Sequence, residues 1–193
     1  MTRIIAGSAG GRRLRTPPGD RTRPTSDRVR EALFSALESE LDTLVGARLV
    51  DVYAGSGAVG LEACSRGADH VTFIERAAAA SGLIRTNARE LGFTSVTVVA
   101  AAAGTAASRP PGSGAHDVAF LDPPYSTDPK EPSGVLTLMA THGWLAPGAV
   151  IVVERARRSG EWRWPAGFVP LRSKRYGDTV LWYGRFVWPP ALT

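Results

Sequence analysis

The sequence predicts an α/β fold, in which helices cover both faces of a mostly parallel sheet. Two observations support this prediction. From residue 48 onward, short apolar runs alternate with longer stretches of helical character. These runs are almost continuously apolar, as is typical of strands buried on both faces of a sheet. Ligands of such sheets bind at the carboxyl ends of the strands, so the residues that follow each strand are the first candidates for a functional site.

The N-terminal residues predict a small β-hairpin and a linker. Two short strands, near 3–6 and 12–16, flank a glycine-rich turn. Residues 20–26 are expected to be extended, because Pro24 disfavours helix at the residue before it. We therefore expect residues 1–25 to form an extension that precedes the main domain.

The main domain begins with a helix and continues as alternating strands and helices. Ser26 or Asp27 can cap the first helix. Its apolar residues form one stripe: Val29, Leu33, Leu37, Leu41 and Leu44. Further helices are expected at 58–67, 77–92 and 133–145, and a loop at the alanine-rich stretch 101–117. Strands are expected at 48–53, 70–75, 95–100, 118–125 (running into a rigid turn) and 148–154, followed by an antiparallel pair at 168–177 and 179–186.

The composition is that of an ordinary soluble globular chain. Of the 193 residues, 44% are hydrophobic and 21% are charged. We expect no membrane association and a cytoplasmic location, because no apolar run could cross a bilayer and the first residues do not resemble a signal peptide. The single cysteine, Cys64, excludes an intramolecular disulfide, and the three histidines lack the spacing of metal ligands, so we expect no metal.

Positive charge is concentrated near the N-terminus. Residues 1–30 contain eight arginines and only two acids, Asp20 and Asp27, whereas the whole chain has a net charge of +5. The rest of the chain is therefore close to neutral. A basic segment on a neutral body suggests a polyanionic partner, and a merely solvated arm is the alternative.

The stretch "DVYAGSGAVGLEA" (51–63) indicates a nucleoside site. Gly55, Gly57 and Gly60 have the G-x-G-x-x-G spacing, and Glu75 ends the next strand, where it can accept hydrogen bonds from ribose hydroxyls. These residues suit NAD and S-adenosylmethionine equally, since both contain adenosine. Asp51 favours S-adenosylmethionine, because a carboxylate here would repel a pyrophosphate but stabilise an ammonium group.

The stretch "FLDPPY" (120–125) indicates a site for a planar amine. Pro123 and Pro124 have a fixed φ and no N–H, so they hold the chain stiff and extended. The Asp122 carboxylate and a nearby carbonyl, such as that of Pro123, could accept both N–H bonds of an exocyclic amine and orient its nitrogen toward a methyl donor. Asp122 could also take a proton from that nitrogen. Tyr125 is positioned to stack on the base.

Taken together, these motifs resemble a known enzyme family. "DVYAGSGAVGLEA" is similar to motif I of class I S-adenosylmethionine-dependent methyltransferases, and "DPPY" resembles the motif of those that methylate amino groups. "RPTSDRVREALFSAL" (23–37) and "KRYGDTVLWYGRF" (174–186) resemble the RsmD family, which methylates N2 of a guanine in 16S ribosomal RNA. The resemblance extends over nearly the whole chain.

This resemblance implies a Rossmann-like, mostly parallel seven-stranded sheet with an antiparallel last strand, a basic extension at 1–25 and a methyltransferase domain at 26–193. It implies S-adenosylmethionine as cofactor, and 16S rRNA in the 30S subunit or its assembly intermediate as partner of a monomer. The implied catalytic residues are Asp122, Pro123, Pro124 and Tyr125. The implied cofactor-binding residues are Asp51, Tyr53, Gly55, Gly57, Glu75, Arg76 and Ala102. The implied RNA-binding residues are Arg3, Arg12, Arg13, Arg15 and Arg23.

One departure from the family pattern and three alternatives remain. Related enzymes often have Asp or Asn after the third strand to face the adenine amine, where this chain has Ala101, Ala102 and Ala103. An NAD-dependent oxidoreductase would explain the glycines and Glu75, but not Asp51, "DPPY" or the basic arm. A non-catalytic RNA-binding protein would leave the intact "DPPY" unexplained. A methyltransferase acting on DNA adenine or protein glutamine would use a similar motif, more often with Asn in first place.

Overall fold

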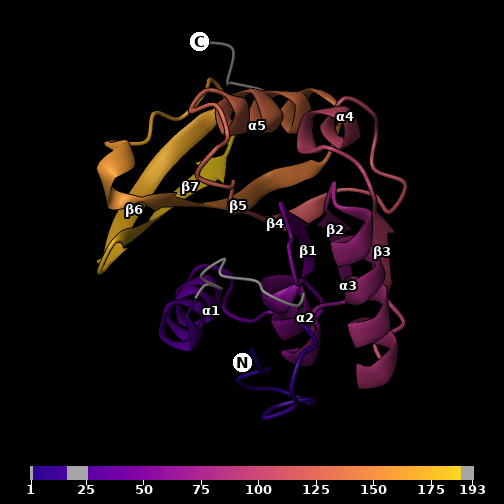
Figure 1. Cartoon of the computed structure of the whole chain (residues 1–193). Helices are drawn as coiled ribbons and strands as arrows, with labels where there is room; N and C mark the ends of the chain where they lie inside the picture. Colours follow the sequence, from indigo (N-terminus) through magenta and orange to yellow (C-terminus); the bar gives the residue numbers. More distant parts are fainter. Residues whose placement is uncertain (1, 17–25, 188–193) are drawn as a thin grey trace.

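A seven-stranded sheet forms the centre of the molecule (Figure 1). The structure, a computed structural model, describes residues 2–16 and 26–187. The strands are β1 (Arg48–Val52), β2 (His70–Ile74), β3 (Val96–Val99), β4 (His116–Leu121), β5 (Leu145–Ala156), β6 (Phe168–Tyr176) and β7 (Thr179–Phe186). Their order is β3-β2-β1-β4-β5-β7-β6; β7 runs antiparallel to both of its neighbours, β5 and β6, and all other neighbouring strands are parallel. The predicted mostly parallel sheet with an antiparallel last strand is confirmed.

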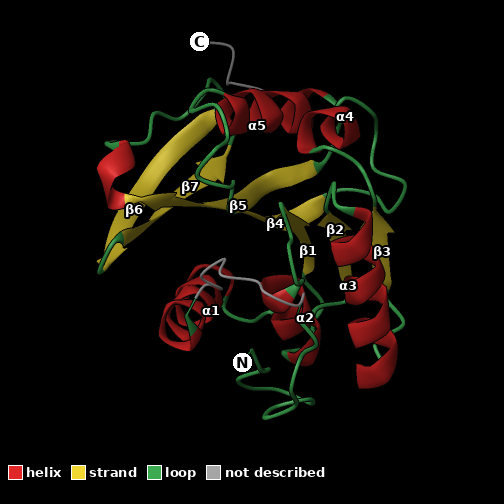
Figure 2. Ribbon diagram, in the orientation of Figure 1, coloured by secondary structure: helices red, strands yellow, loops and turns green. Residues whose placement is uncertain are grey.

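Helices cover both faces of the sheet, as predicted (Figure 2). They are α1 (Asp27–Leu41), α2 (Ala58–Ser65), α3 (Ala78–Leu91), α4 (Ala103–Ala107) and α5 (Glu131–Thr141), with a 3-10 turn, η1, at Arg157–Ser159. The first three pack on one face and α4 and α5 on the other. Successive strand residues alternate between the two apolar cores: Leu49 of β1 belongs to the first and Val50 to the second, and both are fully buried.

Helix α1 begins and packs as its sequence predicts. Ser26 is the N-cap, and its hydroxyl accepts a hydrogen bond from the Val29 N–H at 3.3 Å. Leu33 and Leu37 of the predicted apolar stripe are fully buried. The stripe therefore fixes which side of α1 lies on the sheet.

Two local predictions are wrong. The expected loop at 101–117 contains α4, because Ala103, Ala106 and Ala107 pack into the second core and alanine favours helix. The helix expected to reach residue 145 ends at Thr141, since Gly143 takes a φ of 75° and the chain then enters β5. The expected N-terminal hairpin is present as a short antiparallel pair: Arg3 bridges Arg13, and the N–H groups of Ile4 and Leu14 donate to the carbonyls of Arg12 and Thr2 at 2.8 and 2.9 Å.

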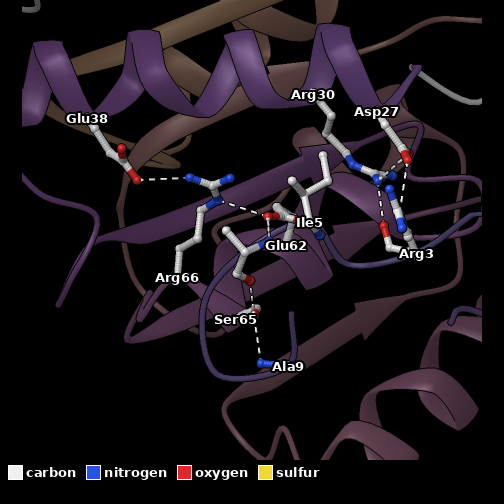
Figure 3. A network of polar contacts seen from close by, with 10 residues as sticks. Arg3, Ile5, Ala9, Asp27, Arg30, Glu38, Glu62, Ser65 and Arg66 are labelled. Carbon is white, nitrogen blue, oxygen red and sulfur yellow. Dashed lines mark hydrogen bonds and ion pairs between the residues drawn. The ribbon is translucent and has the colours of Figure 1, made fainter. Parts of the chain in front are cut away.

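Residues 2–16, which we call the N-terminal arm, pack against α1, α2 and α3. Ile4 and Leu14 are buried in the same core as these helices. The carboxylate of Glu62, on α2, accepts hydrogen bonds from the N–H groups of Ile5 and Ala6 at 2.7 and 3.0 Å (Figure 3). The arm is therefore held against the helices by apolar and polar contacts.

The strand order reverses between β1 and β4. β2 and β3 lie on one side of β1, whereas β4 and β5 lie on the other. The helices that follow β1 and β4 pack on opposite faces. In open α/β sheets ligands bind at such a reversal, between the carboxyl ends of the two strands, and we call this place the crevice. The glycine loop follows β1 and the Asp-Pro-Pro-Tyr turn follows β4, so both lie at this crevice.

Candidate active site

The loop from β1 to α2 carries the three glycines of the predicted nucleoside site. Gly55 and Gly57 have φ angles of 54° and 77°, which residues with a Cβ rarely adopt. A Cβ on Gly60 would lie 2.3 Å from the ring of Phe73, so this glycine allows α2 to pack closely on the sheet. A Cβ on Gly55 would meet no atom within 4 Å. Gly55 therefore borders open space in which a ligand can approach the backbone.

Asp51 is a buried acid in β1, close to this loop. It is 2% exposed, and its Oδ2 accepts a hydrogen bond from the Gly60 N–H at 2.9 Å. Burial raises the pKa of Asp51 to about 8; the Gly60 hydrogen bond opposes the shift and the charge of Glu75 adds to it. A cation placed nearby would favour the ionised form.

Glu75 directly follows β2 and is tied to the glycine loop. Its Oε2 accepts a hydrogen bond from the Gly55 N–H at 2.8 Å, and its Oε1 accepts one from the Ala77 N–H at 2.7 Å. Each carboxylate oxygen has a second lone pair, which remains for a donor such as a hydroxyl group. The neighbouring Arg76 is exposed.

Tyr53 and Ala102 complete the set of predicted cofactor residues. Tyr53 has a φ of 62°, and its hydroxyl donates to Oε1 of Glu131, at the start of α5, at 3.0 Å. Burial and the charge of Glu131 raise the pKa of Tyr53. Ala102 is exposed and precedes α4. Because residues 101–103 are all alanine, only backbone groups could recognise an adenine amine at this position.

The Asp-Pro-Pro-Tyr turn lies beside the end of β1. The Asp122 N–H donates to the Val52 carbonyl at 3.4 Å. Burial, followed by the charges of Glu154 and Asp51, raises the pKa of Asp122 well above its usual value. The Pro124 carbonyl accepts a hydrogen bond from Thr127 at 2.9 Å. Among the described residues no donor reaches the Pro123 carbonyl, so this oxygen is available to a ligand.

Tyr125 is the exposed end of the turn. It is 69% exposed, and the Arg158 guanidinium carbon lies 5.3 Å from the centroid of its ring. One part of the ring is therefore covered by a cation, and the remainder faces solvent.

Two further acids at this crevice, Glu154 and Glu131, were not predicted from the sequence. Glu154 lies beside Asp122, because Leu121 of β4 pairs with Val153 of β5. A signal for Glu154 was available: like Asp51, it is an acid at the end of a buried apolar strand. Glu131 gave no such signal, because its contact with Tyr53 joins residues 78 positions apart.

The arginines of the N-terminal arm lie on a different part of the molecule. The Arg12 guanidinium donates to the Glu90 carbonyl at 2.9 Å, and Arg15 pairs with the Glu90 carboxylate at 2.6 Å. Glu90 is in the last turn of α3, which starts at the carboxyl edge of the sheet and so ends at the opposite edge. Arg3 pairs with Asp27 at 3.4 Å, and Arg13 is exposed. Arg23 lies outside the described residues.

Two negative findings apply to residues 2–16 and 26–187. No helix in these ranges has the length and apolar character needed to span a bilayer. No group of three or more His, Cys, Asp or Glu side chains in these ranges is arranged to hold a metal ion.

A mostly parallel seven-stranded sheet that carries a glycine loop, a following acid and an Asp-Pro-Pro-Tyr turn at one edge defines a class I methyltransferase. The family described as "Conserved hypothetical protein 95" matches residues 2–185, so the chain belongs to this family, the RsmD family that its motifs resemble.

Relatives of known name agree with this assignment. The chain is 37% identical over 178 residues to "Ribosomal RNA small subunit methyltransferase D" of Escherichia coli, a match covering 92% of this chain and 86% of that protein. It is 35% identical to the Haemophilus influenzae protein of the same name, over 79% of this chain and 77% of that protein. The solved structure of the Escherichia coli protein yhhF superposes with a TM-score of 0.84 at 33% identity, covering 96% of this chain and 98% of that one.

These comparisons make the protein a methyltransferase, a class that uses a methyl donor of the S-adenosylmethionine type. They do not favour the nicotinamide-dependent oxidoreductase.

Proposed function

We propose that this protein transfers a methyl group from S-adenosylmethionine to the exocyclic N2 amine of a guanine in 16S rRNA of the small ribosomal subunit. The RNA is supported by the names of the relatives. The chemistry rests on one observation: Asp122 and its diproline turn adjoin the buried Asp51 and the open side of Gly55 at the same sheet edge. We further propose that the protein acts as a cytoplasmic monomer on the 30S subunit or its assembly intermediate.

The chemistry of the crevice suits a cationic cofactor. Asp51 and Asp122 both have raised pKa values, so a positive ligand would relieve the unfavourable burial of their charges. Asp51 would face the ammonium group, the backbone at Gly55 and Gly57 would border the methionine part, and Glu75 would accept hydrogen bonds from the ribose. The cofactor supplies an electrophilic methyl group on a sulfonium sulfur.

The turn after β4 would hold the acceptor amine. The Asp122 carboxylate and the Pro123 carbonyl are two acceptors on consecutive residues, so together they can take both N–H bonds of a planar amine. This grip would fix the plane of the amine, so that the nitrogen lone pair, which is perpendicular to that plane, could face the methyl donor. Positioning of this kind can supply a large share of the rate enhancement.

Asp122 would also receive the proton that the amine loses. Positive charge develops on the nitrogen as the carbon–nitrogen bond forms, and an oxygen of the Asp122 carboxylate can take the proton. Its raised pKa makes this carboxylate a stronger base than an exposed one. Tyr125 would stack on the guanine, an interaction worth about 1–3 kcal/mol.

The test is methyl transfer to small subunits from cells that lack the enzyme, followed by mass spectrometry of the nucleosides. N2-methylguanosine is the expected product, and a modified adenine, or no labelled RNA, would contradict the proposal. The Asp122→Ala variant should bind S-adenosylmethionine but lose at least about 100-fold in kcat, the range typical of a lost acid–base group. Calorimetry should detect S-adenosylmethionine binding and no NADH binding, and tight NADH binding alone would overturn the cofactor assignment.

A further inference from the structure

A basic segment continues β5 past the Asp-Pro-Pro-Tyr turn. β4 ends at Leu121, whereas β5 extends to Ala156 and is followed by η1. Residues 155–158, which we call the β5 arginine segment, contain Arg155, Arg157 and Arg158. The segment follows Glu154, the neighbour of Asp122, and so lies at the same edge of the sheet as the crevice.

The backbone of this segment is held in place by β7. Arg155 pairs with Val180 and Ala156 with Thr179 in the antiparallel ladder. The Arg157 N–H then donates to the Asp178 carbonyl at 2.7 Å. Arg155 and Arg157 therefore lie on backbone that contacts with β7 and Asp178 hold in place.

Two guanidinium groups of the segment, those of Arg155 and Arg158, lie over aromatic rings. Arg158 lies over Tyr125, with its guanidinium carbon 5.3 Å from the ring centroid. Arg155 lies over Trp162 at 5.4 Å and also reaches the Pro129 carbonyl at 3.5 Å.

Arginines on the neighbouring strands behave differently. Arg172 of β6 and Arg185 of β7 both pair with Glu40 of α1. Within the described part of the chain, by contrast, no carboxylate forms an ion pair with Arg157 or Arg158. Both are exposed and keep their positive charge available to an external anion.

The cation–π contact with Tyr125 is compatible with hydrogen bonding by Arg158. A guanidinium group contacts a ring through its flat face, while its five N–H bonds lie in the plane of the group and point outward. Arg158 can therefore stack on Tyr125 and bind a phosphate at the same time. Since Tyr125 is 69% exposed, much of its ring remains available to a base.

The order of the strands gives the direction from which a nucleotide must reach Asp122. The proposed cofactor residues belong to β1, β2 and the loops that follow them. A base held at Asp122, after β4, would therefore have its sugar and phosphates on the side of β5, where the arginine segment lies. Phosphate contacts of this kind position RNA without reading its sequence.

We propose that Arg157 and Arg158 bind the RNA phosphates that flank the target guanine, and that Arg158 also holds the Tyr125 ring in the orientation that stacks on the base. This inference rests on the proposed function. Arg158 is thus a positioning residue, and the β5 arginine segment is an RNA-binding surface separate from the N-terminal arm.

The test compares Arg157→Ala, Arg158→Ala and Arg158→Lys with Arg109→Ala in methyl transfer to small subunits from cells that lack the enzyme. Arg109 is an exposed arginine after α4, and its carbonyl accepts a hydrogen bond from Trp144, which adjoins the amino end of β4. It therefore lies far from the crevice and serves as a charge-matched control.

We expect the alanine variants at 157 and 158 to raise the KM for subunits by on the order of tenfold while the KM for S-adenosylmethionine stays unchanged. Each should also reduce the slope of log affinity against log salt concentration by about 0.7–0.9. Arg158→Ala should in addition lower kcat, because the ring is no longer held. Arg158→Lys should keep the salt slope but not the kcat, because an ammonium group does not stack as a plane.

Each outcome separates the two proposals. If the wild-type protein does not methylate the subunits, the proposed function fails. If the wild type is active and the variants at 157 and 158 match Arg109→Ala in KM and salt slope, the arginine surface is refuted while the proposed function stands. If Arg158→Lys matches the wild type in kcat, Arg158 does not position Tyr125.

Discussion

Two buried acids, Glu62 in α2 and Asp51 in β1, differ in how far the protein stabilises their negative charge. Glu62, within the helix, is fully buried but accepts hydrogen bonds from two backbone N–H groups and pairs with Arg66 at 2.9 Å (Figure 3). Asp51, in β1, is also buried. It accepts one hydrogen bond, from the Gly60 N–H, and its pKa is raised.

The difference separates an acid whose charge the protein stabilises from an acid whose charge it leaves unfavourable. A buried charge needs a partner of opposite sign and filled hydrogen-bonding positions. Glu62 receives both from the protein, because Arg66 is itself fixed by Glu38 and lies over the ring of Phe34. Asp51 has neighbouring acids instead, Glu75 and Asp122, so burial and these charges disfavour its ionisation, and a bound cation would favour it. Substitutions at the two positions should therefore act in opposite directions on the free protein.

The largest change in the free energy of unfolding is expected for Glu62→Ala. The change leaves Arg66 with a weaker partner and removes the acceptor for the N–H groups of Ile5 and Ala6. Breaking a buried pair in this way lowers the free energy of unfolding by about 3–5 kcal/mol. Urea denaturation of the cofactor-free protein would measure it.

The matched control for Glu62 is Glu38→Ala. Glu38 pairs with the same arginine, but its side chain is 44% exposed, so its loss should change the unfolding free energy by about 0–1 kcal/mol. If the two variants were equally stable, the ionic network between the arm, α1 and α2 would not be what holds the arm.

The same contrast explains which features could be predicted from the sequence. Asp51, Glu75 and Asp122 were predictable because carboxyl ends of parallel strands share one edge, so local patterns were enough to bring them together. Glu62 stands in the same motif, yet its role depends on Ile5 and Ala6, 57 and 56 residues away. No local pattern reports such a contact. The arm was for this reason expected to be a separate hairpin, whereas Ile4 and Leu14 belong to the main core.

Helix α4 illustrates a second limit. The stretch at 101–117 has the composition of a loop, and only the sheet face opposite Ala103, Ala106 and Ala107 explains why one turn of it is helical. By contrast, the location of Glu154 beside Asp122 follows from the parallel register of β4 and β5. It could have been predicted by applying to β5 the argument used for Asp51.

Asp51→Asn should have the next largest effect on the free energy of unfolding, and it should raise this free energy in the cofactor-free protein. The folded protein keeps the Asp51 proton up to a pH of about 8, whereas the unfolded chain releases it near 3.8. Between these values the folded state binds more protons, so the free energy of unfolding falls as pH rises, by up to about 1.4 kcal/mol per pH unit. Asparagine can still accept the Gly60 hydrogen bond but does not titrate, so the variant should lose this part of the slope.

Urea denaturation of the cofactor-free protein at pH values from 5 to 8 would measure the effect. A residual slope of the same sign should remain, because the pKa of Asp122 is also raised. The variant should bind S-adenosylmethionine at least about tenfold more weakly, since it lacks the charge that faces the ammonium group. A slope identical to that of the wild type would show that Asp51 is not an acid kept neutral by burial.

The smallest effect is expected for Arg13→Ala, which tests the arm as an RNA contact. Deleting the arm would not be informative, because Ile4, Leu14 and the Glu62 contacts make it part of the folded core. Arg13 is exposed, so its loss should change the unfolding free energy by no more than about 0.5 kcal/mol. If the arm meets phosphates, the salt slope of subunit binding should fall by about 0.7–0.9, whereas the Arg109→Ala control should leave it unchanged. An unchanged slope for Arg13→Ala would mean that the arm serves the fold through Glu62 and leaves RNA binding to residues nearer the crevice.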